Sequence, residues 1–147
     1  MGLLLLLHLG AAVIWVGGMS FVLLVLRPAL LASFDPPQRA RLLLACLRRF
    51  LALVWACVAV LLGSGVAFMQ QAGWGAAPLA WQAMMGLGLA MMVVFAYLAL
   101  GPWRSAQAAA AQQEWSGVAA ALTRIHRIVQ VNFTLGWLAL AAITLLR

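Results

Sequence analysis

Apolar residues along the chain are gathered into four runs, which cover residues 3–26, 50–68, 81–100 and 124–146. Each run is close to the ~20 residues with which a helix crosses the ~30 Å hydrocarbon core of a bilayer. Shorter segments that contain arginine, glycine or proline separate the runs. The pattern predicts an all-α fold, a transmembrane four-helix bundle that forms one domain over residues 1–147.

Arginine is confined almost entirely to two of the connecting segments. Eight of the nine cationic residues lie between Arg27 and Arg49 or between Arg104 and Arg127. Cytoplasmic loops beside membrane spans retain Lys and Arg, whereas translocated loops lack them. Both stretches are therefore predicted to face the cytoplasm, with both termini on the periplasmic side. The absence of lysine and the frequent use of Ala, Leu and Arg are typical of a GC-rich bacterial genome, so we expect a multi-pass protein of the bacterial inner (plasma) membrane.

Composition excludes several classes of protein. The chain is 67% hydrophobic and 7% charged, whereas about a quarter of the residues of a soluble domain are charged. The formal net charge of +7 raises the question of nucleic acid, but the arginines lie at the ends of spans, where anionic headgroups attract them. The expected partners are the lipid bilayer and either other membrane subunits or further copies of this chain, and not nucleic acid.

Proline and glycine mark the expected ends of the helices. The step from Arg27 to Pro28 is expected to close the first helix, and the step from Gly101 to Pro102 the third. Residues 33–37 predict the start of the second helix, since Ser or Asp can cap free N–H groups and proline is tolerated in the first turn. Residues 69–80 contain Gly and Pro without charge and predict an interfacial loop. The fourth helix is expected to begin near Ser116.

The two proline steps also give a weak internal resemblance. The triplet Leu26, Arg27, Pro28 stands 74 positions before Leu100, Gly101, Pro102. Two hairpins of like orientation would give this spacing, and so would chance similarity between two apolar hairpins.

Small residues indicate where the helices approach one another. Lipid gives apolar helices no hydrophobic reason to associate, so close van der Waals contact at small side chains supplies the attraction. The positions expected at these contacts are Gly10, Gly17, Gly18, Ala52, Ala56, Gly63, Gly86, Ala90 and Gly136.

Two histidines fall within the predicted helices, and an ionisable residue in a span is a candidate functional residue. His8 lies about two turns into the first run, and His126 lies at the start of the fourth, between Arg124 and Arg127. The predicted topology places them at opposite depths of the membrane. One haem or one copper ion held by both is therefore excluded.

A metal or haem site is predicted around His8. Met19 lies on the same face of the first helix, and Met84 and Met85 belong to the periplasmic end of the third. Imidazole and thioether together suit Cu(I), and histidine with methionine also suits haem iron. The alternative is that His8 forms a hydrogen bond across helices while the methionines fill the core, so copper, haem b and no cofactor all remain open.

A second candidate site lies at the cytoplasmic end. Guanidinium groups match carboxylates and phosphates, so an anion or a haem propionate could bind among basic residues there, or these residues could simply be solvated. The residues concerned are Arg48, Arg49, Arg124, His126 and Arg127. The two acids, Asp35 and Glu114, fall in the predicted loops, so no catalytic residue is predicted and a binding or structural role is favoured over an enzyme.

The stretch from Leu7 to Met19, which reads LHLGAAVIWVGGM, resembles the opening helix of the CopD-like family of bacterial membrane proteins, which is distantly related to the HemJ family. The resemblance continues more generally along the whole chain. It implies a four-helix inner-membrane protein that handles copper, or b-type haem on the HemJ side, with His8 as the family histidine. Related sequences often carry histidine at two places in the third helix where this chain has Gln82 and Tyr97, so a second strong ligand is missing.

Three functions therefore remain open. The first is copper or haem handling at the periplasmic side, around His8 with Met84 or Met85. The second is a cofactor-free accessory subunit that packs against a larger membrane complex. The third is a redox enzyme that acts on quinone or porphyrin, which only the distant kinship and the basic cytoplasmic end favour.

Overall fold

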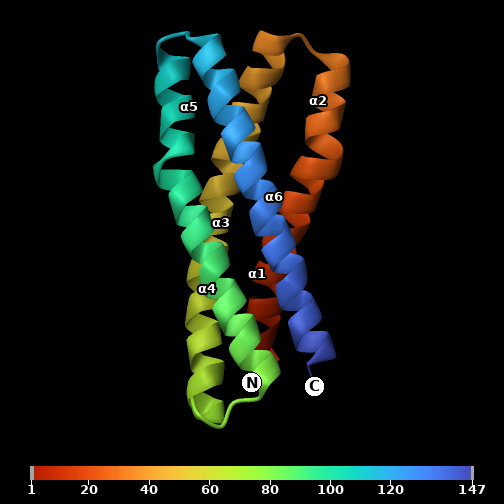
Figure 1. The fold of residues 1–147 in the computed structure, drawn as a ribbon, viewed down its shortest axis with the longest axis vertical. Helices are drawn as coiled ribbons and strands as arrows, with labels where there is room; N and C mark the ends of the chain where they lie inside the picture. Colours follow the sequence, from red (N-terminus) through yellow and green to blue (C-terminus); the bar gives the residue numbers. More distant parts are fainter. Residues whose placement is uncertain (1, 147) are drawn as a thin grey trace.

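The computed structural model describes residues 2–146 and consists of four long helical segments joined by short turns (Figure 1). The segments are Gly2–Ser33, Pro36–Ala72, Leu79–Ala111 and Trp115–Leu145, and all four are long and apolar enough to cross a membrane. The prediction of an all-helical chain is confirmed, and each of the four predicted spans falls, to within one residue, in one of these helical segments. The fold is that of a multi-pass membrane protein.

The helical segments extend well beyond the predicted spans. They contain 31 to 37 residues, which at 1.5 Å per residue gives lengths of about 46 to 56 Å, against ~30 Å of hydrocarbon. Most of the extra length lies at the arginine-rich end. The stretches predicted as loops there are mostly helical, and the non-helical residues that remain are 34–35, 101 and 112–114.

The first segment does not end at Pro28, so that prediction is wrong. α1 (Gly2–Phe21) continues through a π-helical stretch, η1 (Val22–Leu26), into α2 (Arg27–Ser33). Proline has no N–H and its ring clashes with the carbonyl four residues earlier, which here belongs to Leu24. The backbone widens in front of the proline, and the N–H of Arg27 donates to the carbonyl of Val22, five residues back. The wider turn admits Pro28 without ending the helix.

The other predicted boundaries lie close to the observed ones. α3 (Pro36–Ala72) begins at the expected prolines, with Asp35 extended before it. α4 (Leu79–Leu100) ends at Gly101, as predicted, and α5 (Pro102–Ala111) follows it directly. α6 (Trp115–Leu145) begins one residue before Ser116. The predicted loop at residues 69–80 shortens to residues 73–78, where Gly73 adopts a φ of 77° that favours glycine.

The bundle is built from two hairpins. α1 packs mainly against α3, and α4 mainly against α6, while α5 also lies along α6. Both termini and the turn between α3 and α4 lie at one end, and the other two turns lie at the opposite end (Figure 1). Trp15 and Phe95 meet edge to face at the centre, with ring centroids 5.8 Å apart. The core therefore joins α1 of one hairpin to α4 of the other.

Two of the glycines expected at helix contacts lie where helices touch. A Cβ added to Gly18 would stand 2.7 Å from Cζ of Phe50 in α3. A Cβ on Gly136 would meet Val16 at 3.1 Å and Met91 at 3.3 Å. Four further glycines expected there have open space where a Cβ would point, and at these the expectation is wrong: Gly10, Gly17, Gly63 and Gly86.

Neighbouring glycines of α1 give a test of this packing. Gly18→Ala should lower the free energy of unfolding by about 1–3 kcal/mol, because the added methyl overlaps the ring of Phe50. Gly17→Ala should leave it unchanged or raise it by up to about 1 kcal/mol, since that position is open and Ala favours helix. Reversible unfolding in mixed micelles measures both. Equal effects of the two substitutions, or no recovery when Phe50→Leu is added to Gly18→Ala, would contradict the packing described.

Candidate functional site

His8 is held by a hydrogen bond that joins α1 to α3. Its Nδ1 lies 2.6 Å from Oγ of Ser64, which is only 3% exposed. The Ser64 hydroxyl itself donates to the carbonyl of Val60 at 2.6 Å. A hydroxyl has a single hydrogen, so Ser64 accepts from His8 and Nδ1 carries the proton of the imidazole. The Nε2 atom of neutral His8 therefore carries the lone pair.

Aromatic rings continue from His8 towards α4. The imidazole meets Phe68 edge to face with ring centroids 5.6 Å apart, and Phe68 meets Trp81 in the same way at 6.3 Å. Phe68 lies one turn beyond Ser64 on α3, and Trp81 lies in the first turn of α4. His8 thus belongs to the end of the bundle that carries the termini.

Of the methionines predicted as ligands, Met85 in α4 reaches α3 beside Ser64, the residue that His8 contacts. Its Cε methyl lies 3.3 Å from the place a Cβ of Gly65 would take, and Gly65 is the neighbour of Ser64. Met84 precedes it on the same turn and is half-buried. Met19 lies in the central core, 2% exposed, and eleven residues along α1 separate it from His8 by about 16 Å. Met19 cannot share an ion with His8.

The donor chemistry near His8 is soft. No group of three or more His, Cys, Asp or Glu side chains that could hold a metal ion occurs within residues 2–146. The two cysteines, Cys46 and Cys57, are unbridged and lie eleven residues apart on α3. An ion at His8 would thus combine one imidazole with thioether sulfur, a set that suits Cu(I) and not a hard cation.

A cavity of about 190 Å³ lies at the arginine-rich end. It is enclosed by η1, α2, the first turns of α3 and the first half of α6. Arg27, Arg39 and His126 bring positive or titratable groups to it, and no acid lines it. Most of the remaining wall is aliphatic: Val22, Leu23, Leu30, Leu31, Leu43, Leu47, Leu122, Ile125 and Val129. The arrangement suits an anionic group attached to an apolar chain.

Only one of the residues predicted for the cytoplasmic anion site lines this cavity. His126 does so, whereas four predicted arginines are exposed and lie outside its wall: Arg48, Arg49, Arg124 and Arg127. Arg27 and Arg39 take their place. The spacing of Arg39, Leu43 and Leu47, four residues apart on one face of a helix, is a sequence signal that could have singled out Arg39. Arg27 follows the π-helical stretch, which shifts its register.

A buried amide lies deeper in the bundle. Asn132 is 4% exposed, and its Oδ1 has no hydrogen-bond partner among residues 2–146. It borders a small inner cavity of about 20 Å³, together with Trp15, Met19 and Phe95. That volume is about enough for one water molecule, which would give Oδ1 a donor. Four residues belong to the walls of both cavities: Val22, Leu47, Ile125 and Val129.

The two histidines lie far apart, as the predicted topology requires. His8 contacts Ser64 of α3, and His126 of α6 lines the same cavity as Arg39, which also belongs to α3. Twenty-five residues of helix separate these two positions, or about 37 Å. A single haem or copper ion bound by both histidines is excluded.

The fold and these two regions define a helical multi-pass membrane protein with a histidine at one end and a basic cavity at the other. Comparison with protein-family models, with curated proteins and with solved structures finds no match for this chain.

The hydrogen bond between His8 and Ser64 makes a measurable contribution to stability. In a double-mutant cycle, His8→Ala and Ser64→Ala should show a coupling free energy of about 0.6–1.7 kcal/mol, the range of hydrogen bonds between membrane helices. Unfolding in mixed micelles measures the cycle. Ser20→Ala is the control partner, because the Ser20 hydroxyl bonds only to Val16 of its own helix. The assignment fails if His8 couples no more strongly to Ser64 than to Ser20.

Proposed function

We propose that the protein is a bacterial inner-membrane protein that binds copper, as Cu(I), at a periplasm-side site around His8. The observation that carries the proposal is the hydrogen bond from His8 Nδ1 to Ser64. A metal-bound histidine almost always donates its other ring N–H to an oxygen of the protein, which fixes the tautomer and the direction of the ring. The bond between His8 and Ser64 meets this requirement.

Met85 is the candidate for a second donor of the right kind. Met85 lies at the level of Ser64 on α3, with Met84 beside it in the chain. Thioether and imidazole donors together favour Cu(I) over zinc or magnesium. When bound, Cu(I) would accept the lone pairs of the imidazole nitrogen and the thioether sulfur. Ser64 orients the imidazole of His8, and Phe68 packs against it.

A compact ion fits this place better than haem b. A haem with two axial ligands would need a second strong ligand beside His8. The third-helix positions at which related sequences often carry histidine do not provide one. The Gln82 side-chain amide donates a hydrogen bond to the carbonyl of Ala77. Tyr97 lies near the opposite end of α4, and its side chain is 65% exposed.

Two features of the sequence support a site on the periplasmic side of the bacterial inner membrane. The arginine-rich end is assigned to the cytoplasm by the positive-inside rule, which puts His8 and the termini on the periplasmic side. The resemblance of residues 7–19 to the CopD-like family points to the same membrane and to copper.

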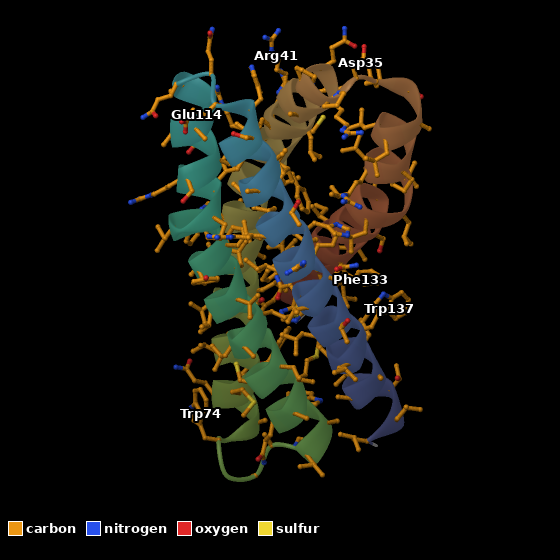
Figure 2. The ribbon with its side chains drawn as sticks, turned by 45° about the horizontal axis from the view of Figure 1, so that its top comes forward. Asp35, Arg41, Trp74, Glu114, Phe133 and Trp137 are labelled. Carbon is orange, nitrogen blue, oxygen red and sulfur yellow. The ribbon has the colours of Figure 1, made fainter. Side chains whose placement is uncertain are left out.

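The alternative is a cofactor-free accessory subunit of a larger membrane complex, and an exposed aromatic pair favours it. Phe133 and Trp137 stack edge to face on α6 with centroids 6.3 Å apart, and Trp137 is 56% exposed. The Trp137 side chain points away from the bundle (Figure 2). Tryptophan concentrates at the membrane interface, whereas Trp137 falls near the middle of the fourth span, where contact with another protein would cover it.

Anaerobic competition with a chromophoric Cu(I) chelator tests the copper proposal, on protein from which any affinity tag has been cleaved. The intact chain should bind one Cu(I), and His8→Ala should abolish binding. Ser64→Ala should weaken it about 10- to 100-fold, the usual effect of removing a group that orients a ligand. Met19→Leu and His126→Ala are matched controls and should retain the original affinity.

Two results would contradict the copper proposal: no Cu(I) bound by the intact chain, or equal binding by His8→Ala. A Soret band lost in His8→Ala would assign the site to haem instead. Absence of both ligands, together with extraction in a larger assembly from which Trp137→Ala is released, would establish the accessory subunit.

A further inference from the structure

On each of the three helical segments that line the cavity at the arginine-rich end, aliphatic side chains lie deeper in the bundle than the basic residue. On the first segment Val22 and Leu23 lie deeper in the bundle than Arg27, and on α3 Leu43 and Leu47 lie deeper than Arg39. On α6, Val129 lies one turn deeper than His126. Apolar side chains also lie further out than two of the basic residues, Leu30 and Leu31 beyond Arg27 and Trp115 and Leu122 beyond His126, so these basic groups are set within an apolar wall.

Basic groups set within an apolar wall suit a charged headgroup that is attached to an apolar chain. The cavity also lies at the arginine-rich ends of the helices, where lipid headgroups are expected. Basic pockets between membrane helices bind anionic lipid headgroups. The absence of any acid from the cavity wall leaves the positive charge of Arg27 and Arg39 free of an opposing carboxylate there.

The size of the cavity indicates how much of a ligand it holds. Its volume of about 190 Å³ falls below the ~300–1,000 Å³ of pockets that enclose a small molecule. A ligand of lipid size that enters it must remain partly outside. A phospholipid meets this condition, because its headgroup region and part of one chain can lie in the cavity while the rest stays in the bilayer.

Irregular backbone forms part of the cavity wall. The π-helical stretch Val22–Leu26 contributes two residues to the wall, and Arg27 follows it directly. Pro36 and Pro37, which begin α3, line the same cavity. A π turn within an α-helix is often found at a functional site. Here Arg27, which lines the cavity, directly follows it.

We infer that this cavity is a binding site for one anionic phospholipid, with the phosphate held by Arg27, Arg39 and His126 and one chain lying against Val22, Leu47 and Val129. The site is separate from His8 and does not depend on the copper proposal.

Native mass spectrometry of the protein released from vesicles of equimolar phosphatidylglycerol and phosphatidylcholine tests the inference. One phosphatidylglycerol should remain on each chain. The double variant Arg27→Gln with Arg39→Gln should lower its affinity about 30-fold, since each basic residue contributes at the membrane surface. The control, Arg48→Gln with Arg49→Gln, removes the same charge from exposed residues outside the cavity and should leave affinity within about 2-fold.

Equal losses in the two double variants would show general attraction to anionic headgroups and would overturn the site, as would no loss in either. Ala119→Leu provides a second test if the cavity variant fails to fold, because Ala119 is exposed and lines the cavity. Its larger side chain should displace the lipid, and unchanged retention would contradict the inference. Oleate and inorganic phosphate, added separately to phosphatidylcholine vesicles, should not occupy the cavity. Oleate bound as tightly as phosphatidylglycerol would assign it to a free fatty acid.

Discussion

The cost of placing a guanidinium group in hydrocarbon governs the arrangement of this protein. A charged side chain at the centre of a membrane helix costs ~2.5 kcal/mol or more, and eight of the nine arginines lie in the two stretches at one end of the bundle. Asp35, Arg41 and Glu114 all appear at that end (Figure 2). Since charges are excluded from the rest of each span, the two ends acquire different chemistry: one has His8 and no Arg, Asp or Glu among residues 2–146, and the other is basic and has a cavity.

Proline shapes the basic end in two different ways. Pro28 and Pro102 occupy corresponding places in the first helix of each hairpin, 74 residues apart. At Pro28 the backbone widens into a π turn and the helix continues, whereas at Pro102 the chain breaks at Gly101 and restarts as α5. Of these two sites, only the π turn before Pro28 contributes residues to the cavity wall. α5 lies closely along α6 instead, so two hairpins of similar design give one open side and one closed side.

The sequence predicts the number of spans well because length and hydrophobicity alone determine it. It predicts the contacts between helices poorly, because runs that are apolar on every side carry little periodicity to show which face is buried. Ser64, the partner of His8, lies 56 residues away along the chain. Arg27 and Arg39 line the cavity in place of the more obvious pairs of adjacent basic residues, since the π turn and the helical start of α3 fix directions that composition does not reveal. Asn132 is buried, but the residues on either side of it, Val131 and Phe133, are apolar and do not indicate which face of the helix is buried.

The central claim is that the arginine-rich end faces the cytoplasm, so that His8 and the basic cavity open on opposite sides of the membrane. Single cysteines placed in a background of Cys46→Ala and Cys57→Ala test it most directly. A membrane-impermeant maleimide applied to intact bacterial spheroplasts should label Ala76→Cys, in the turn between α3 and α4, and should label Gln112→Cys, in the turn after α5, only after the membrane is permeabilised. Labelling of Gln112→Cys in intact spheroplasts, with Ala76→Cys protected, would contradict the account.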